Sequence, residues 1–192
     1  KNRLDKNRLD KNRLDKNRLE FENMTLTQNT NTNTNINRDQ KKEIQKWINK
    51  VKQNGNALYY ASAELKGNKE VVLEAINQYG YVLKYAHDSL KKDEEVVLKA
   101  LKKNVFSLIY ADESLKKNKD FIIKALKVCK WGTFLEFVTP ELKKDRDVVI
   151  EAVRQWGMSL QFADDIFKKD KEIVLIAVKQ YCNSLEYADS SL

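Results

Sequence analysis

The chain has 192 residues, of which 42% are hydrophobic and 33% are charged, and its net charge is +8. This composition is ordinary for a water-soluble protein, and no apolar run approaches the roughly 20 residues that a membrane-spanning helix needs. The N-terminus also lacks the apolar stretch of a signal peptide, so we expect a cytoplasmic protein. Because the first residue is Lys1 rather than Met, we keep the alternative that the sequence is a fragment of a longer chain.

The first 40 residues are low in complexity. A five-residue unit occurs there as KNRLD and then as KNRLE, and the polar tract TLTQNTNTNTNIN follows. Leucines spaced by five residues advance by about 140° around a helix and form no seam. The tract is too polar to offset the entropy lost on ordering. We predict a disordered tail over residues 1–40, with a localisation tag or a transient helix on a partner as alternatives.

Residues 41–192 repeat a unit of about 25 residues. It reads NKEVVLEAINQYGYVLKYAHDSLKK from Asn68 and DEEVVLKALKKNVFSLIYADESLKK from Asp93. Units this small cannot bury their apolar faces alone and are stabilised by stacking. We therefore predict an all-α domain, a right-handed α-solenoid of about six units near residues 41–67, 68–92, 93–117, 118–144, 145–169 and 170–192.

A long helix is predicted to open each unit. An Asn or Asp stands at its N-cap and an acidic residue follows within two positions, which suits the positive end of a helix. These caps are Asn68, Asp93, Asn118, Asp145 and Asp170. Glycine recurs after the helix, where a left-handed C-cap needs no Cβ. The glycines are Gly55, Gly80, Gly132 and Gly157, and Val105 and Cys182 in their place predict corners that are strained or built differently.

A short second helix and then a 3₁₀ turn are predicted to complete the unit, with Thr139 and Pro140 opening one such turn. The second helix carries an inward leucine at Leu58, Leu83, Leu108, Leu135, Leu160 and Leu185. Two residues later, an aromatic column follows at Tyr60, Tyr85, Tyr110, Phe137, Phe162 and Tyr187. We favour core packing for this column, and for Trp131 and Trp156, over a platform that stacks bases.

The two ends of the array differ from its middle. Ile44, Trp47, Ile48 and Val51 form a narrow stripe, which is typical of a helix that is packed on one side only. At the other end the sequence stops at Leu192 without a polar closing helix. An uncapped apolar end favours self-association, unless the chain continues.

The repeated pattern E-V-V-L-x-A, then Gly, then L-x-Y-A-x-x-x-L-K-x-D resembles the helical repeat family known as domain of unknown function 4116. The resemblance covers roughly Lys41–Leu192, and a two-residue insertion near Trp131 and the missing glycines depart from it. The resemblance implies a helical repeat fold and almost nothing about activity. A broader likeness to solenoids that alternate α- and 3₁₀-helices is architectural analogy only.

The residues favour a protein that is not an enzyme and takes no cofactor. The one histidine, His87, stands in a helix-capping slot that Ser62, Asp112 and Asp164 fill in other units, so we interpret it as a cap rather than a general base. Cys129 and Cys182 occupy different repeat positions and are interpreted as reduced thiols. No cluster with metal-ligand spacing and no phosphate-binding glycine loop occurs in the sequence.

The strongest functional signal is electrostatic. One position on the polar side of the long helix carries a cation in most units, and further lysines lie next to it. Together they form a predicted basic ridge, which comprises Lys52, Lys99, Lys102, Lys103, Lys124, Lys127, Arg154 and Lys179. Such a ridge could follow a phosphate backbone, or it could be a solvated face. The Lys-Lys pairs that end each unit are better explained by the Asp or Asn caps and acids that follow each pair, and by favourable charge at a helix end, than by ligand binding.

A second candidate is the position after the turn, where the residue type varies while its neighbours stay fixed. It is occupied by Asn56, Tyr81, Phe106, Thr133, Met158 and Asn183. Such variation suits peptide recognition and equally suits an unconstrained surface. We interpret the chain as a protein-protein interaction scaffold for an unidentified protein or peptide, with binding of nucleic acid or another anionic surface by the basic ridge as the alternative.

Overall fold

The computed structural model describes residues 38–129 and 131–192. The chain divides into two compact units, Lys1–Lys46 and Trp47–Leu192. In the first unit the described residues, 38–46, are helical, and Lys42 pairs with Asp39 at 3.4 Å. The predicted tail lies outside the described residues except for 38–40, which belong to this helical stretch.

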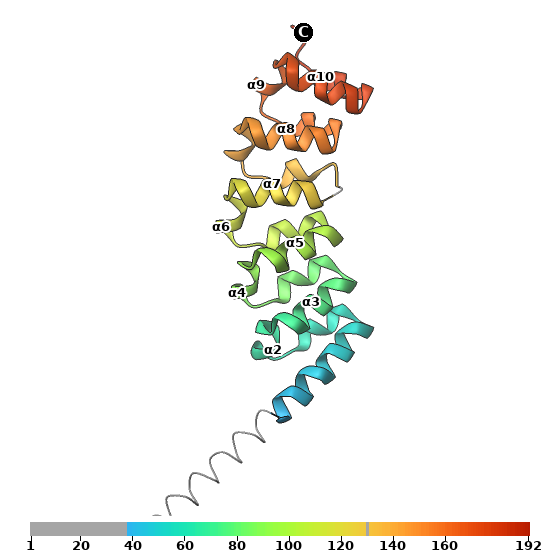
Figure 1. Cartoon of the computed structure of the whole chain (residues 1–192), viewed down its shortest axis with the longest axis vertical. Helices are drawn as coiled ribbons and strands as arrows, with labels where there is room; N and C mark the ends of the chain where they lie inside the picture. The colour runs from blue at the N-terminus through green and yellow to red at the C-terminus, as the bar shows by residue number, and fades with distance from the viewer. Residues whose placement is uncertain (1–37, 130) are drawn as a thin grey trace, which may run out of the picture. The chain divides into compact units, whose positions relative to one another are not determined.

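The second unit is built from repeated helical elements, and no strand occurs among its described residues. Residues 47–53 are helical, and five helices of ten residues each follow. Each of these long helices packs on the next one along the chain, in the order that Figure 1 shows. They are α3 (Lys69–Gln78), α5 (Glu94–Lys103), α7 (Lys119–Val128), α8 (Arg146–Gln155) and α10 (Lys171–Gln180).

The predicted N-caps of the long helices are confirmed. The side chain of Asn68 accepts a hydrogen bond from the backbone N–H of Val71, and Asp93 accepts from Glu95 and Val96. Asn118, Asp145 and Asp170 cap α7, α8 and α10 in the same way. Each cap satisfies amide groups that have no partner within the helix.

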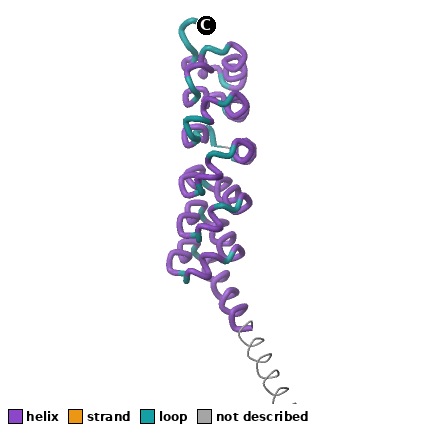
Figure 2. Tube along the Cα trace, turned by 90° about the vertical axis from the view of Figure 1, so that its left-hand side faces the viewer, coloured by secondary structure: helices purple, strands orange, loops and turns teal. Residues whose placement is uncertain are grey.

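The two short elements of each unit occur in the opposite order to the prediction. A 3₁₀-helix follows the long helix directly, and a short α-helix of one turn comes third in most units, joined by the short loops seen in Figure 2. The 3₁₀-helices are η1 (Gly55–Tyr60), η2 (Gly80–Tyr85), η3 (Val105–Tyr110), η4 (Phe134–Phe137), η6 (Gly157–Phe162) and η7 (Cys182–Tyr187). The short α-helices are α2 (Ala63–Gly67), α4 (Asp88–Lys91), α6 (Glu113–Lys116) and α9 (Asp165–Lys168).

The unit from Asn118 is the exception. Its third element is the 3₁₀-helix η5 (Leu142–Lys144), which starts two residues after Pro140, so the predicted start at Thr139 and Pro140 is wrong. The carbonyl of Thr139 still accepts a hydrogen bond from the N–H of Lys143 at 3.0 Å. Pro140 and Glu141 therefore form a turn ahead of η5.

The hydrophobic core follows the repeat pattern. In α3, the buried residues are Val71, Val72, Ala75 and Ile76, and the equivalent positions of the other long helices are largely buried as well. The predicted inward leucines of the 3₁₀-helices are fully buried from Leu58 to Leu160, but Leu185 in the last unit is 60% exposed. In the helix at 47–53, Ile48 and Val51 are buried as the one-sided stripe predicts.

The glycines after the long helices are required for close packing and not for a left-handed cap. None of the described glycines has a positive φ, so the predicted left-handed conformation is wrong. A Cβ added to Gly80 would lie 2.3 Å from the carbonyl oxygen of Ala100 in the next long helix. The same clash would occur between Gly55 and Ala75 and between Gly157 and Ala177. Glycine thus lets a 3₁₀-helix touch the backbone of the following unit.

The unit that carries Val105 in place of this glycine is built differently. Val105 is buried, and it carries a side chain at the position where Gly55, Gly80 and Gly157 approach the backbone of the next unit. Accordingly η2 packs on α5 and η6 packs on α10, whereas no comparable packing joins η3 to α7 in the described part of the chain. Cys182, which also replaces this glycine, is exposed.

Ion pairs link successive units at the start of the long helices. Lys69 contacts the carboxylates of Asp93 and Glu95, each at 2.7 Å. Lys119 makes the equivalent pairs with Asp145 and Asp147. Arg146 makes them with Asp170 and Glu172. In the unit between those of Lys69 and Lys119, Glu94 stands in place of the cation. It pairs with Lys124 instead, at 2.9 Å. The junction between α5 and α7 is therefore irregular in both packing and charge.

Candidate interaction surface

Exposed aromatic residues mark the ends of several long helices. Trp156 and Tyr181 are the C-caps of α8 and α10, and their backbone leaves helical geometry for an extended conformation. Their side chains are 51% and 47% exposed, and Trp131 is 48% exposed. The prediction that Trp131 and Trp156 are packed in the core is therefore wrong. A residue that leaves the helical conformation no longer follows the helical phase that directs core side chains inward.

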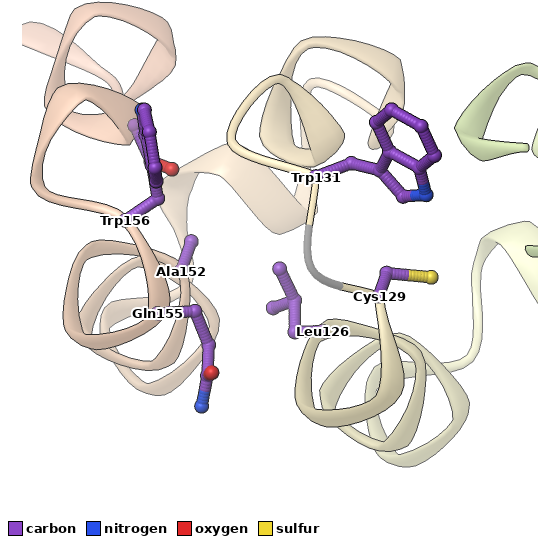
Figure 3. A pocket seen from close by; sticks show the side chains of 7 residues that line it. Leu126, Cys129, Trp131, Ala152, Gln155 and Trp156 are labelled. Atoms are coloured by element: carbon purple, nitrogen blue, oxygen red, sulfur yellow. The ribbon is translucent and has the colours of Figure 1, made fainter. Parts of the chain in front are cut away.

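Two grooves separate these rings. The first groove has a volume of about 310 Å³ between α7 and α8, and Figure 3 shows the side chains around it. It is lined by Leu126, Cys129, Trp131, Ala152, Gln155, Trp156 and Ser159. The second groove, of about 210 Å³, lies between the ends of α8 and α10 and is lined by Gln155, Trp156, Gly157, Gln180 and Tyr181. We call these two grooves, with their three exposed rings, the aromatic edge.

The aromatic edge is held in place by contacts between units. The Trp156 ring lies so close to Gly132 that a Cβ there would come within 2.4 Å of the indole. The Ser159 hydroxyl donates a hydrogen bond to the Gly132 carbonyl at 3.0 Å. The rings of Trp156 and Tyr181 stack with centroids 6.5 Å apart and an interplanar angle of 17°. Because these groups are preorganised, a ligand would lose little entropy in ordering them.

Sequence reasoning noticed the rings of the aromatic edge but missed their exposure and the amides beside them. The side-chain nitrogen of Gln180 donates to the Arg154 carbonyl oxygen at 3.1 Å, which places this amide in the groove below Trp156 and Tyr181. The available signal was an aromatic residue directly before the turn, at the position where helical geometry ends.

The predicted aromatic column is not part of the core. Tyr60 is 76% exposed, and the other five members, from Tyr85 to Tyr187, are half-buried. Some members contact neighbouring rings: Tyr85 meets Tyr59 edge-on with centroids 5.1 Å apart, and Phe137 meets Phe106 at the same distance. The column packs along the surface of the array, so the expectation of core burial is wrong.

The residues of the predicted basic ridge are all at the surface. Lys99 is half-buried, and the others, Lys52, Lys102, Lys103, Lys124, Lys127, Arg154 and Lys179, are exposed. Lys124 pairs with Glu94 at 2.9 Å. The remaining seven make no ion pair with a carboxylate in the described part of the chain. A third groove, of about 420 Å³, is lined by Glu95, Leu98, Lys99, Lys102, Lys103 and Val128.

Acids neutralise most of the Lys-Lys pairs, but the partners are not the caps and acids that directly follow each pair. The first lysine bonds within its own short helix, as Lys91 does to Asp88 at 3.0 Å. The second faces the cap of the next short helix, as Lys92 does to Asp112 at 3.9 Å. Lys144 and Lys169 face Asp164 and Asp189 at similar distances.

The predicted variable positions follow the first residue of the turn and are half-buried or exposed. Three of them contact an aromatic neighbour: Tyr81 stacks on Tyr79 with centroids 5.5 Å apart, Phe106 meets Phe137, and Asn183 reaches the Tyr181 hydroxyl at 3.5 Å. Asn56, Thr133 and Met158 lie at the same register. Recognition by this set remains a prediction.

His87 caps α4, as the sequence predicts. Its Nδ1 accepts a hydrogen bond from the backbone N–H of Ser89 at 3.2 Å, and the side chain is exposed. Burial raises the pKa of the Cys129 thiol to about 12, although nearby Lys102 opposes the shift. Both cysteines are free thiols. Within residues 38–129 and 131–192, no cluster of His, Cys, Asp and Glu has the geometry to hold a metal ion.

The comparisons with known proteins concern the repeat. A family described as Domain of unknown function (DUF4116) matches residues 48–91, 93–143, 120–165 and 145–192. The chain belongs to this family. The overlapping DUF4116 matches agree with the repeated helical units, and they confirm the resemblance drawn from the sequence motif. No curated protein and no solved structure matches the chain. Among the described helices of this DUF4116 member, none is long and apolar enough to cross a membrane.

Proposed function

We propose that the chain is a non-enzymatic protein-protein interaction scaffold, built as a right-handed α-solenoid of about six units. The stacking of each long helix on the next, in chain order, supports a solenoid. Solenoids commonly bind partners along extended surfaces and not in a single deep cavity. The free thiols of Cys129 and Cys182 fit a reducing compartment, and we propose the cytoplasm.

The observation that carries this proposal is the aromatic edge. Two adjacent grooves, bounded by Trp131, Trp156 and Tyr181, lie at two successive junctions between long helices. Exposed aromatic rings supply large apolar area with few rotatable bonds, and such residues dominate binding energy at protein interfaces. An extended peptide can place successive side chains in successive grooves. Gln155 lines both grooves, and its amide nitrogen donates to Glu151 at 2.8 Å, so its amide oxygen is the group that a peptide N–H would meet.

The proposal is tested by selecting ligands from a random peptide display library on the wild-type domain and measuring their affinities by anisotropy. Trp156→Ala should weaken the selected peptides at least tenfold, because the ring borders both grooves. Tyr79→Ala is the matched control, since Tyr79 is the equivalent C-cap, is 44% exposed and stacks on Tyr81. Circular dichroism checks that both variants fold.

Selection of peptides that bind both variants equally well would refute the role of the aromatic edge, as would a library that yields no ligand. Turnover of a substrate that depends on His87 would refute the non-enzymatic scaffold itself.

We also propose self-association through the last unit. Leu185 is 60% exposed although its counterparts in earlier units are fully buried, and Leu175 is 48% exposed. Sedimentation velocity should show an oligomer that dissociates on dilution, and Leu185→Glu should shift it to monomer. A monomer at all concentrations, or an oligomer unaffected by the substitution, would contradict this interface.

A further inference from the structure

The third groove lies where the array departs from its own rule. In regular junctions glycine brings the 3₁₀-helix onto the next long helix, with backbone atoms in direct contact. At the α5–α7 junction Val105 stands in that place, and η3 does not pack on α7 in the way that η2 packs on α5. A groove of about 420 Å³ lies beside this junction, lined by α5 residues and by Val128 of α7. The groove thus lies at the junction where two successive long helices pack less extensively than at the other described junctions between long helices.

This groove is strongly basic. Lys99, Lys102 and Lys103 line it, and none of the three pairs with a carboxylate in the described chain. The one acidic residue in the lining, Glu95, is already bound to Lys69 at 2.7 Å. Only this unit carries lysine at all three positions. The preceding unit, for example, has Glu74, Asn77 and Gln78 there. The cluster of three lysines is therefore confined to this unit.

Part of the lining of the groove is apolar. Leu98 and Val128 line it beside the three lysines. Water is partly excluded from such a surface, so the attraction between a lysine and a bound anion is screened less than on an open helix face. A flat membrane cannot enter a recess between two helices, whereas a flexible strand can.

Cations continue from the groove across the next three units. Lys127, Arg154 and Lys179 occupy the register of Lys102 on α7, α8 and α10, and all are exposed without a carboxylate partner in the described residues. Packed helices lie about 8–10 Å apart, so the four cations span roughly 25–30 Å. A compact phosphate ligand cannot reach all four. An extended polyanion can.

We propose that the α5–α7 groove anchors single-stranded nucleic acid, whose phosphates follow the cations from Lys102 to Lys179. Exposed rings stand directly after the two helices that form the groove: Phe106 follows α5 and is 52% exposed, and Trp131 follows α7. Figure 3 shows the Trp131 side chain pointing away from Trp156, toward the preceding unit. Single-strand binding proteins combine such a basic groove with aromatic rings that stack on bases. A rigid duplex would touch the ridge but could not fold its bases onto these rings.

The test is fluorescence anisotropy of a labelled oligouridine of about 16 nucleotides, long enough to span the ridge. About five neutralised phosphates give a salt slope of about −3.5, so affinity should fall roughly 100-fold between about 50 and 200 mM salt. Lys102→Gln with Lys103→Gln should weaken binding at low salt at least tenfold and reduce the slope to about −2.

The matched control is Lys117→Gln with Lys171→Gln, which removes the same charge beside the N-terminal ends of α7 and α10 and should change affinity less than twofold. Equal weakening by the two double variants would overturn the proposal, because it would mean attraction to net charge alone. So would stronger binding to a duplex of the same length or to vesicles containing phosphatidylserine, or the absence of binding at low salt.

Discussion

Replacing Gly80 by alanine is expected to destabilise the repeat domain by about 2 kcal/mol, because the close contact between units leaves no room for a methyl group. An added Cβ would lie 2.3 Å from the Ala100 carbonyl oxygen, 2.9 Å from the Ser107 hydroxyl and 3.1 Å from the Asn104 nitrogen. Two of these neighbours are backbone atoms of the next unit. They cannot rotate away, so the two units must separate.

The magnitude follows from three contributions. Overpacking costs about 1–3 kcal/mol. The added methyl group also crowds the Ser107 hydroxyl, 2.9 Å away, and so displaces it from its buried hydrogen bond to the Ala100 carbonyl, 3.4 Å long, which is worth about 1 kcal/mol. The smaller conformational freedom of alanine in the unfolded chain returns about 0.4–1 kcal/mol. A net loss of about 2 kcal/mol lowers the ratio of folded to unfolded protein roughly 30-fold.

The assay is urea unfolding followed by circular dichroism, together with hydrogen exchange at the Asn104 amide, which bonds to the Ala100 carbonyl at 2.9 Å. Gly67→Ala is the control, because a Cβ at Gly67 would meet only the His87 side chain, at 3.7 Å or more, and should be neutral or slightly stabilising. Gly80→Asn distinguishes close packing between units from a left-handed helix cap as the reason for glycine at this position. Asparagine is tolerated in a left-handed cap but is larger than alanine, so greater stability of Gly80→Asn than of Gly80→Ala would refute the close-packing argument.

Two further predictions concern titratable groups. Burial alone would raise the pKa of Asp93, but hydrogen bonds from Lys69 and from the Val96 amide outweigh it, and the pKa lies below its usual value. The resulting stabilisation is complete above the unfolded pKa of about 3.9 and is lost as pH falls through the folded pKa. Urea midpoints at pH 7 and pH 3 should therefore differ less in Asp93→Asn than in the wild type, and an unchanged difference would count against this ion pair. Ellman's reagent should modify exposed Cys182 at least about 100-fold faster than buried Cys129, whose pKa is about 12. Comparable rates in the native protein would show that the groove beside Trp131 admits the reagent to Cys129.

The sequence by itself determined the parts of this protein that depend on local pattern. The spacing of apolar residues gave the repeated helices, and short-range hydrogen bonding gave their caps, from Asn68 to Asp170. The ion pair between Lys91 and Asp88 was also accessible, because the two residues stand three positions apart on one short helix. Only residue types and their spacing were needed for these inferences.

The tertiary structure decided what depends on contacts between units. Whether Gly80 serves a turn or a close approach is set by the position of Ala100, 20 residues away. The exposure of Trp156 depends on where α8 ends and on how Gly132 meets its ring. The basic groove lies at the junction where η3 does not pack on α7, and that junction places Val128 of α7 beside Lys102 and its neighbours. A repeat pattern specifies each unit, but distances between units arise only when side chains from both sides compete for the same space.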